Sequence, residues 1–80
     1  MEFHTIRSVK PLKDMILDVL FNNGTNKKYD VKKLLQNHNE FKKLENEESF
    51  KEVKVDIGGY GIVWNEELDL SSEEIWNNGY

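Results

Sequence analysis

Eighty residues with a net charge of −4 and no cysteine allow one small domain that no disulfide stabilises. No apolar run approaches the ~18 residues that a membrane-spanning helix needs. The first residues lack the basic and apolar regions of a signal peptide. We therefore expect a single domain over residues 1–80, working in the cytoplasm and away from membranes.

The charge is distributed unevenly along the chain. Residues 1–35 carry seven Lys or Arg against four Asp or Glu, whereas residues 36–80 carry four against eleven. A protein that binds nucleic acid through phosphates needs clustered cations. The cations of the first half are spread out, which favours solvated faces over a nucleic-acid site: Arg7, Lys10, Lys13, Lys27, Lys28, Lys32 and Lys33.

Three strands are expected at the start of the chain. Residues 3–12 are rich in Ile and Val, and Pro11 places this strand at an edge or near its own end because proline donates no ladder hydrogen bond. The alternating pattern of residues 15–21 predicts a second strand. The Asn-Asn-Gly-Thr run at 22–25 predicts a tight hairpin turn, and residues 27–31 are expected to form the antiparallel strand that follows it.

Helical segments follow. Asp30 is placed to cap a short helix that ends near Gln36, because its carboxylate can accept from free backbone N–H groups. A second helical stretch is expected over residues 40–52, with Asn46 dividing it into two short turns. Its inward residues are Phe41, Leu44 and Phe50.

Two further strands are expected in the second half. Val, Lys, Val, Asp and Ile alternate over residues 53–57, a pattern typical of a half-buried strand. The glycine-rich run 58–61 turns the chain and residues 62–64 return it. Residues 65–70 are then expected to form a polar connection in which Leu68 and Leu70 are the buried residues.

A final helix completes the chain. Ser71 and Glu74 have the spacing of a capping box, and the helix is expected to run to Asn78 and to end at Gly79. Runs of strands with separate helices indicate an α+β fold. We predict one small, mostly antiparallel sheet with helices packed on it, in the order β-β-β-α-α-β-β-α.

The sequence contains no motif that indicates catalysis. A strand follows the glycines at 58–61, where a phosphate loop would need the start of a helix. His4 and His38 have no partner at a spacing that makes a metal site or a nucleophile–base pair. Ser71 is explained by its capping role. We expect no catalytic residue, no cofactor and no metal, and an enzyme is the least favoured alternative.

The acidic residues near the C-terminus are also interpreted as solvated. A calcium loop needs ligands at alternating positions and a glycine at its sharp turn, whereas leucines interrupt this group: Glu66, Glu67, Asp69, Glu73 and Glu74. Glu73 and Glu74 suit the positive end of a helix dipole.

The aromatic residues offer two interpretations. Trp64 and Trp76 can pack the last helix onto the sheet, which is the favoured interpretation for each. In the other interpretation an exposed aromatic edge docks a partner, since Tyr and Trp are frequent at interface centres. Tyr60, at a turn, is the member expected to be most exposed. The candidate partner-binding residues are Gly58, Gly59, Tyr60, Ile62 and Trp64.

The chain resembles one family over almost its whole length. The resemblance rests on residues 29–35, 41–44, 53–65 and 68–71, and most specifically on the Gly-Gly-Tyr-Gly-Ile-Val-Trp-Asn block at 58–65. These residues are similar to the small bacterial proteins grouped as the domain of unknown function 2442 family. The resemblance implies a compact α+β fold, with no established catalytic residue or cofactor.

The resemblance also implies a genetic context. Some members carry a helix-turn-helix domain after the family domain, and we expect none in this chain, which ends at Tyr80. Members are often encoded beside another small protein, which suggests an antitoxin-like protein or a regulatory adaptor. We therefore expect a non-enzymatic protein-interaction module whose partner is another small protein. A component of a nucleic-acid-associated regulator is the alternative, and an edge strand would permit a homodimer.

Overall fold

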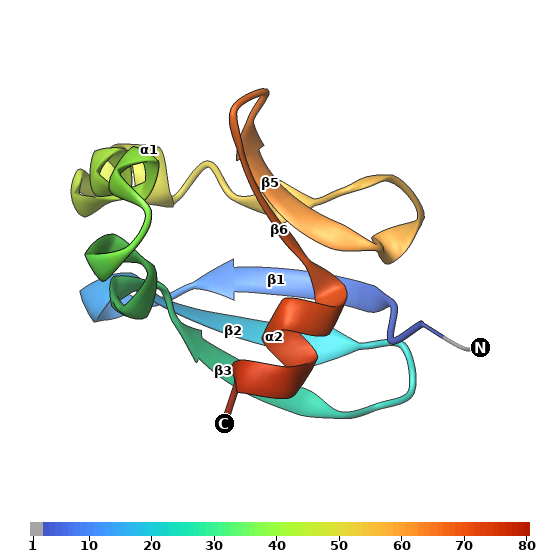
Figure 1. Ribbon diagram of the computed structural model, residues 1–80. Coiled ribbons are helices and arrows are strands. Elements are labelled where there is room, and N and C mark those ends of the chain that lie inside the picture. The colour runs from blue at the N-terminus through green and yellow to red at the C-terminus, as the bar shows by residue number, and fades with distance from the viewer. Residues whose placement is uncertain (1–2) are drawn as a thin grey trace.

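The structure is a computed structural model that describes residues 3–80 as six strands in two antiparallel sheets, with short helices around them (Figure 1). It confirms the predicted α+β class. It corrects the predicted single sheet of five strands, because the two halves of the chain each form a sheet of their own. Within the described residues, no helix has the length and apolar character needed to cross a membrane.

The first sheet contains β1 (Ile6–Pro11), β2 (Ile16–Phe21) and β3 (Asn26–Asp30), with β2 in the centre. The tight hairpin predicted between β2 and β3 is present. Asn23 accepts from the backbone N–H of Thr25 at 2.9 Å, and Gly24 adopts a φ of 91°. Pro11 ends the edge strand β1, as expected from its missing N–H group.

The helical region between the sheets also follows the sequence signals. Asp30 accepts from the N–H of Lys32 at 3.0 Å and begins η2 (Val31–Gln36), which is a 3-10 helix. The next segment divides at Asn46 into η3 (Asn39–Glu45) and α1 (Glu47–Phe50). The side chain of Asn46 accepts from the N–H of Ser49, so the residue that divides the segment also caps its second part.

The second sheet contains β4 (Lys54–Val55), β5 (Gly61–Asn65) and β6 (Leu68–Ser71), with β5 in the centre. Two predictions about this region are wrong. The strand predicted to reach Ile57 ends at Val55, and the predicted polar connection after residue 64 contains β6. Asn65 explains the second difference, because its side chain accepts from the N–H groups of Glu67 and Leu68 and closes a tight turn.

The last helix, α2 (Ser72–Asn78), confirms the predicted boundaries. Ser71 accepts from the N–H of Glu74 at 3.1 Å, whereas the Glu74 carboxylate accepts from the Tyr29 hydroxyl at 2.8 Å instead of reaching back to the cap. After the helix, Tyr80 exchanges two backbone hydrogen bonds with Lys28, which attaches the end of the described chain to the edge of β3.

Both sheets contribute to one hydrophobic core. Figure 1 shows the second sheet above the first, with α2 crossing in front of the strands. The buried residues form a single cluster that includes Leu17, Val19 and Phe21 of β2, Ile62 and Trp64 of β5, and Ile75 of α2. This arrangement leaves the turn before β5, the N-terminal segment and the exposed side of α2 next to one another at the surface.

Candidate protein-binding surface

The turn between β4 and β5 has a backbone that only glycine adopts easily. Asp56 accepts from the N–H of Ile57 and begins the short helix η4 (Ile57–Gly59). Gly58 and Gly59 have φ values of 77° and 78°, in the left-handed region. A Cβ on Gly59 would lie 2.6 Å from the carbonyl oxygen of Ile6. The turn is therefore held tightly against the start of β1.

Three large hydrophobic side chains are exposed around this turn. Ile57 is 92% exposed, Tyr60 59% and Phe3 58%. The Tyr60 ring lies over Gly58, where a Cβ would come within 2.8 Å of its Cε2, and it meets the Phe3 ring edge-on at 5.9 Å between centroids. We refer to Phe3, Ile57, Gly58 and Tyr60 as the aromatic surface. Exposed apolar groups gathered in this way mark binding sites more often than single exposed residues do.

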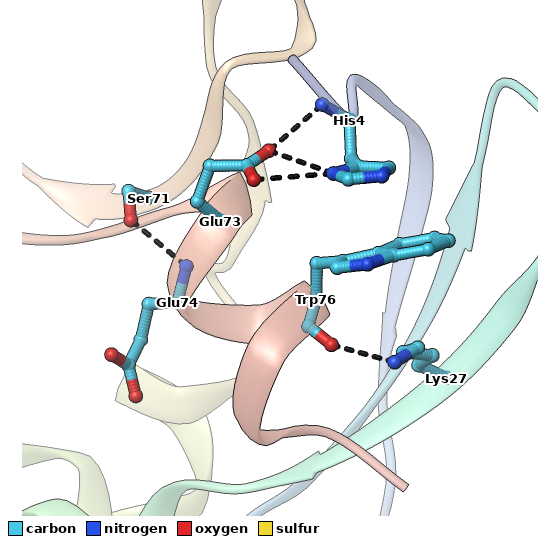
Figure 2. Close-up of polar contacts among 6 residues, drawn as sticks. All are labelled: His4, Lys27, Ser71, Glu73, Glu74 and Trp76. Atoms are coloured by element: carbon cyan, nitrogen blue, oxygen red, sulfur yellow. Dashed lines mark hydrogen bonds and ion pairs between the residues drawn. The ribbon is translucent and has the colours of Figure 1, made fainter. Parts of the chain in front are cut away.

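His4 lies next to the aromatic surface and is fixed to α2. Its backbone N–H donates to the Glu73 carboxylate at 2.8 Å, and its ring Nδ1 lies 3.1 Å from both oxygens of that carboxylate. The imidazole stacks on the Trp76 ring, with centroids 3.7 Å apart and an angle of 8° between the planes. Figure 2 shows Glu73 and Trp76 holding His4 from two directions.

Trp76 is in turn held by the first sheet. Phe21 of β2 meets its ring edge-on at 5.0 Å. Lys27 of β3 donates to the Trp76 carbonyl oxygen at 2.6 Å, and its Nζ lies 4.6 Å from the ring centroid, a cation–π distance (Figure 2). The half-buried Trp76 therefore connects the N-terminal segment, the first sheet and α2.

Two side chains of α2 take part in contacts that shift a pKa. The pKa of Glu73 is lowered from its ordinary value of 4.5, first by the backbone N–H of His4 and then by the His4 ring. Burial raises the pKa of the Tyr29 hydroxyl well above its usual range, and its hydrogen bond to Glu74 adds to the increase. Glu73 is thus a carboxylate committed to holding His4, and this corrects its prediction as a solvated acid.

The chain from residue 55 onward, which supplies Ile57, Gly58 and Tyr60, is anionic in sequence. Residues 55–80 contain no Lys or Arg, and their six carboxylates belong to Asp56, Glu66, Glu67, Asp69, Glu73 and Glu74. Asp56 adjoins the exposed Ile57, and Glu73 adjoins His4. Glu67 lies at the other end of β5, with its carboxylate 3.4 Å from Lys43 of η3. Asp56 is therefore the carboxylate that a cationic partner would meet beside Ile57.

The structure separates the predicted partner-binding residues into two groups. Gly58, Gly59 and Tyr60 belong to the turn that forms the aromatic surface. Ile62 is fully buried and Trp64 is 4% exposed, so both belong to the core. Tyr60 has helical backbone angles and extended chain begins only at Gly61, so Tyr60 does not share the face of Ile62 and Trp64.

Sequence patterns did not reveal the place of four residues in this region: Phe3, His4, Ile57 and Glu73. Trp76 packs α2 onto the first sheet, as the favoured interpretation of the sequence expected. His4 and Glu73 are 69 positions apart, and no local pattern indicates such a contact. Phe3 was expected inside a strand that in fact begins at Ile6. The Gly58-Gly59 pair was the one signal that could have indicated an exposed Ile57. Two successive residues in the left-handed conformation cannot continue a strand, so the strand had to end before them.

A groove lies elsewhere on the molecule, between the β1–β2 connection and the helical region. It has a volume of about 610 Å³. Leu44 and Phe50 lie at its buried side, whereas its charged lining residues are exposed. Asp14 and Met15 at its edge have φ values of 61° and 58°, which is unusual for residues with side chains.

The described residues contain no group of three His, Cys, Asp or Glu arranged to hold a metal ion. The chemistry that the aromatic surface offers is apolar contact, aromatic stacking and attraction of cations. These are the interactions by which one polypeptide recognises another.

A family described as "Protein of unknown function (DUF2442)" matches residues 6–80 of the chain. No curated protein and no solved structure matches this chain.

Proposed function

We propose that this chain, which belongs to the DUF2442 family, is a protein-binding module that docks a basic partner on its aromatic surface. The observation that carries the proposal is the gathering of Phe3, Ile57 and Tyr60, each more than half exposed, around one turn. Burial of exposed aromatic and aliphatic groups under a partner lowers the free energy of the complex.

Two features support a polypeptide as the partner. Tyr60 presents a rigid ring with a polar hydroxyl, and such rings are frequent among residues that dominate interface energies. The exposed carboxylate of Asp56, next to Ile57, supports a basic partner, because complementary charge increases the association rate and excludes anionic competitors.

The partner we propose is another small protein encoded next to this one, and the role we propose is that of an antitoxin-like protein or a regulatory adaptor in the cytoplasm. The lack of cysteine fits a reducing compartment. The genetic context is the one implied by resemblance to the family, in which neighbouring small genes are frequent.

Co-expression with the neighbouring gene product tests the proposal. We expect a complex that survives size-exclusion chromatography at micromolar concentration. Ile57→Ala combined with Tyr60→Ala should weaken the complex by at least about tenfold, since each side chain loses its apolar contact. Failure to form a complex, or a complex that the double variant leaves unchanged, would overturn the proposal.

Tyr80→Ala is the matched control for this experiment. Tyr80 is 67% exposed, but it lies at the edge of β3, and its attachment to Lys28 uses backbone atoms that the substitution keeps. It should bind the partner as the unchanged chain does.

A nucleic-acid titration at two salt concentrations separates the proposal from the nucleic-acid-associated alternative. Binding through phosphates weakens steeply as salt rises. Of the cations in the first half, Lys27 is bound to Trp76, and Lys32 to Asp14 and Asp30. We therefore expect no salt-dependent binding of this kind, and its detection would favour the alternative.

A further inference from the structure

We propose that residues 3–5 form a strap whose docking completes the aromatic surface, and that His4 is the positioning residue that holds the strap in place. The inference rests on the proposed function, since it concerns how the same surface is assembled. It assigns to His4 a role in binding that is exerted through Phe3.

The strap lies outside the ladder of the first sheet, because β1 begins at Ile6. Thr5 fixes one end: its carbonyl oxygen accepts from the backbone N–H of Asn22 at 2.9 Å, and its hydroxyl accepts from the side chain of Asn22 at 2.8 Å. Thr5 thereby joins the strap to the β2–β3 turn.

His4 fixes the middle of the strap. The backbone N–H and the ring Nδ1 of His4 both form hydrogen bonds with the carboxylate of Glu73, and the ring stacks on Trp76 (Figure 2). A lone surface ion pair contributes little to stability. The combination of a backbone bond, a ring bond and a stacked aromatic face is directional, however, and it determines where the next residue toward the N-terminus must lie.

Phe3 is that residue. Its ring meets Tyr60 edge-on, and it remains 58% exposed. The carboxylate of Glu73 and the ring of Trp76 therefore act on the aromatic surface at a distance, through the backbone of the strap. Release of His4 would leave Tyr60 and Ile57 in place and would free Phe3 from the surface.

Nuclear magnetic resonance of the full chain tests the strap without any partner. We expect cross-peaks between the ring protons of Phe3 and Tyr60 in the unchanged chain and their loss in His4→Ala. Cross-peaks between the core rings of Phe50 and Trp64 should persist in both and report that the variant is folded. His38→Ala is the matched control, since that histidine is exposed and lies in a different part of the fold.

A binding cycle with the neighbouring gene product then tests whether His4 acts through Phe3. We expect Phe3→Ala and His4→Ala each to weaken binding by about tenfold, and the double variant to bind no more weakly than either single variant, because the two substitutions remove the same contact. Additive losses would show that His4 contacts the partner directly and would overturn its positioning role.

The two proposals fail in different ways. Phe3–Tyr60 cross-peaks that persist in His4→Ala overturn the positioning role of the His4 ring, whatever the chain binds. A complex that Ile57→Ala with Tyr60→Ala leaves unchanged overturns the proposed function, while the resonance result for the strap still stands.

Discussion

Tyr60 and Trp64, two aromatic residues four positions apart in the sequence, have opposite roles in the structure. Trp64 is buried, and its ring N–H donates to the Phe50 carbonyl oxygen at 3.1 Å, whereas Tyr60 is largely exposed. Trp64→Ala should lower the free energy of unfolding by roughly 3–5 kcal/mol, and Tyr60→Ala by less than about 1 kcal/mol. Urea denaturation of both variants measures the difference. Similar losses would contradict the division between core and surface.

The Glu73 carboxylate makes stability depend on pH. Its pKa is below 4.5 in the folded chain, so its ionised form favours folding at any pH above 4.5, and this contribution is lost as the pH falls through the lowered pKa. The difference in unfolding free energy between the unchanged chain and Glu73→Gln should therefore be constant near neutrality and should shrink in acid.

Denaturation between pH 3 and 7, roughly the range over which carboxyl groups titrate, measures this difference. Glu66→Gln is the control, because Glu66 is an exposed acid in the β5–β6 turn and its replacement should leave the pH profile unchanged. A difference for Glu73→Gln that persists unaltered into acid would show that the contact with His4 does not depend on the charge.

At the scale of elements, Gly24 and Gly59 both adopt a left-handed φ, but only Gly59 is also packed tightly against another strand. Alanine substitutions at the two positions therefore measure separately the cost of backbone strain and the cost of a steric clash. Gly24 has a φ of 91° and no atom within 4 Å of a built Cβ, whereas a Cβ on Gly59 would lie 2.6 Å from the Ile6 carbonyl oxygen. Gly24→Ala should cost about 1 kcal/mol of stability from strain alone. Gly59→Ala should cost about 1–3 kcal/mol more, because the turn must move away from β1. Thermal or urea denaturation would show the order, and equal costs would contradict it.

The elements that could be predicted from the sequence are those with local causes. Asp30, Asn46 and Ser71 each cap a helix with their own side chain, and the hairpin at Gly24 is specified within four residues. The strand β6 was missed because a turn closed by the Asn65 side chain resembles an irregular polar loop.

The candidate site was less accessible to sequence analysis, for a physical reason. Tyr60 was expected at an exposed turn and is there, but its neighbour Phe3 comes from the other end of the chain. The stacking of His4 on Trp76 depends on how α2 lies against the first sheet, which packing determines and no spacing in the sequence encodes. Ile57 continues the alternating pattern of residues 53–57, which predicts a buried strand residue. The two glycines that follow turn the chain, and Ile57 is exposed instead.

At the scale of the molecule, the two sheets share one core, and this predicts cooperative unfolding. The buried cluster combines residues of both sheets with Ile75 of α2, and α2 contacts β3 as well as β5 and β6. Each sheet of three strands buries its apolar side chains in this one cluster, which the other sheet and the helices complete, and chains of this size are marginally stable even when intact. We therefore expect the domain to unfold in a single transition.

Trp64 and Trp76 are natural probes of this cooperativity, since one lies in β5 and the other packs α2 against the first sheet. In Trp76→Phe and in Trp64→Phe, the remaining tryptophan should report the same urea midpoint as circular dichroism of that variant, although the two variants differ from each other in stability. A midpoint for Trp76 fluorescence well below that of circular dichroism would mean that α2 and the strap detach before the sheets separate. Phe3 would then leave the aromatic surface while most of the fold remained.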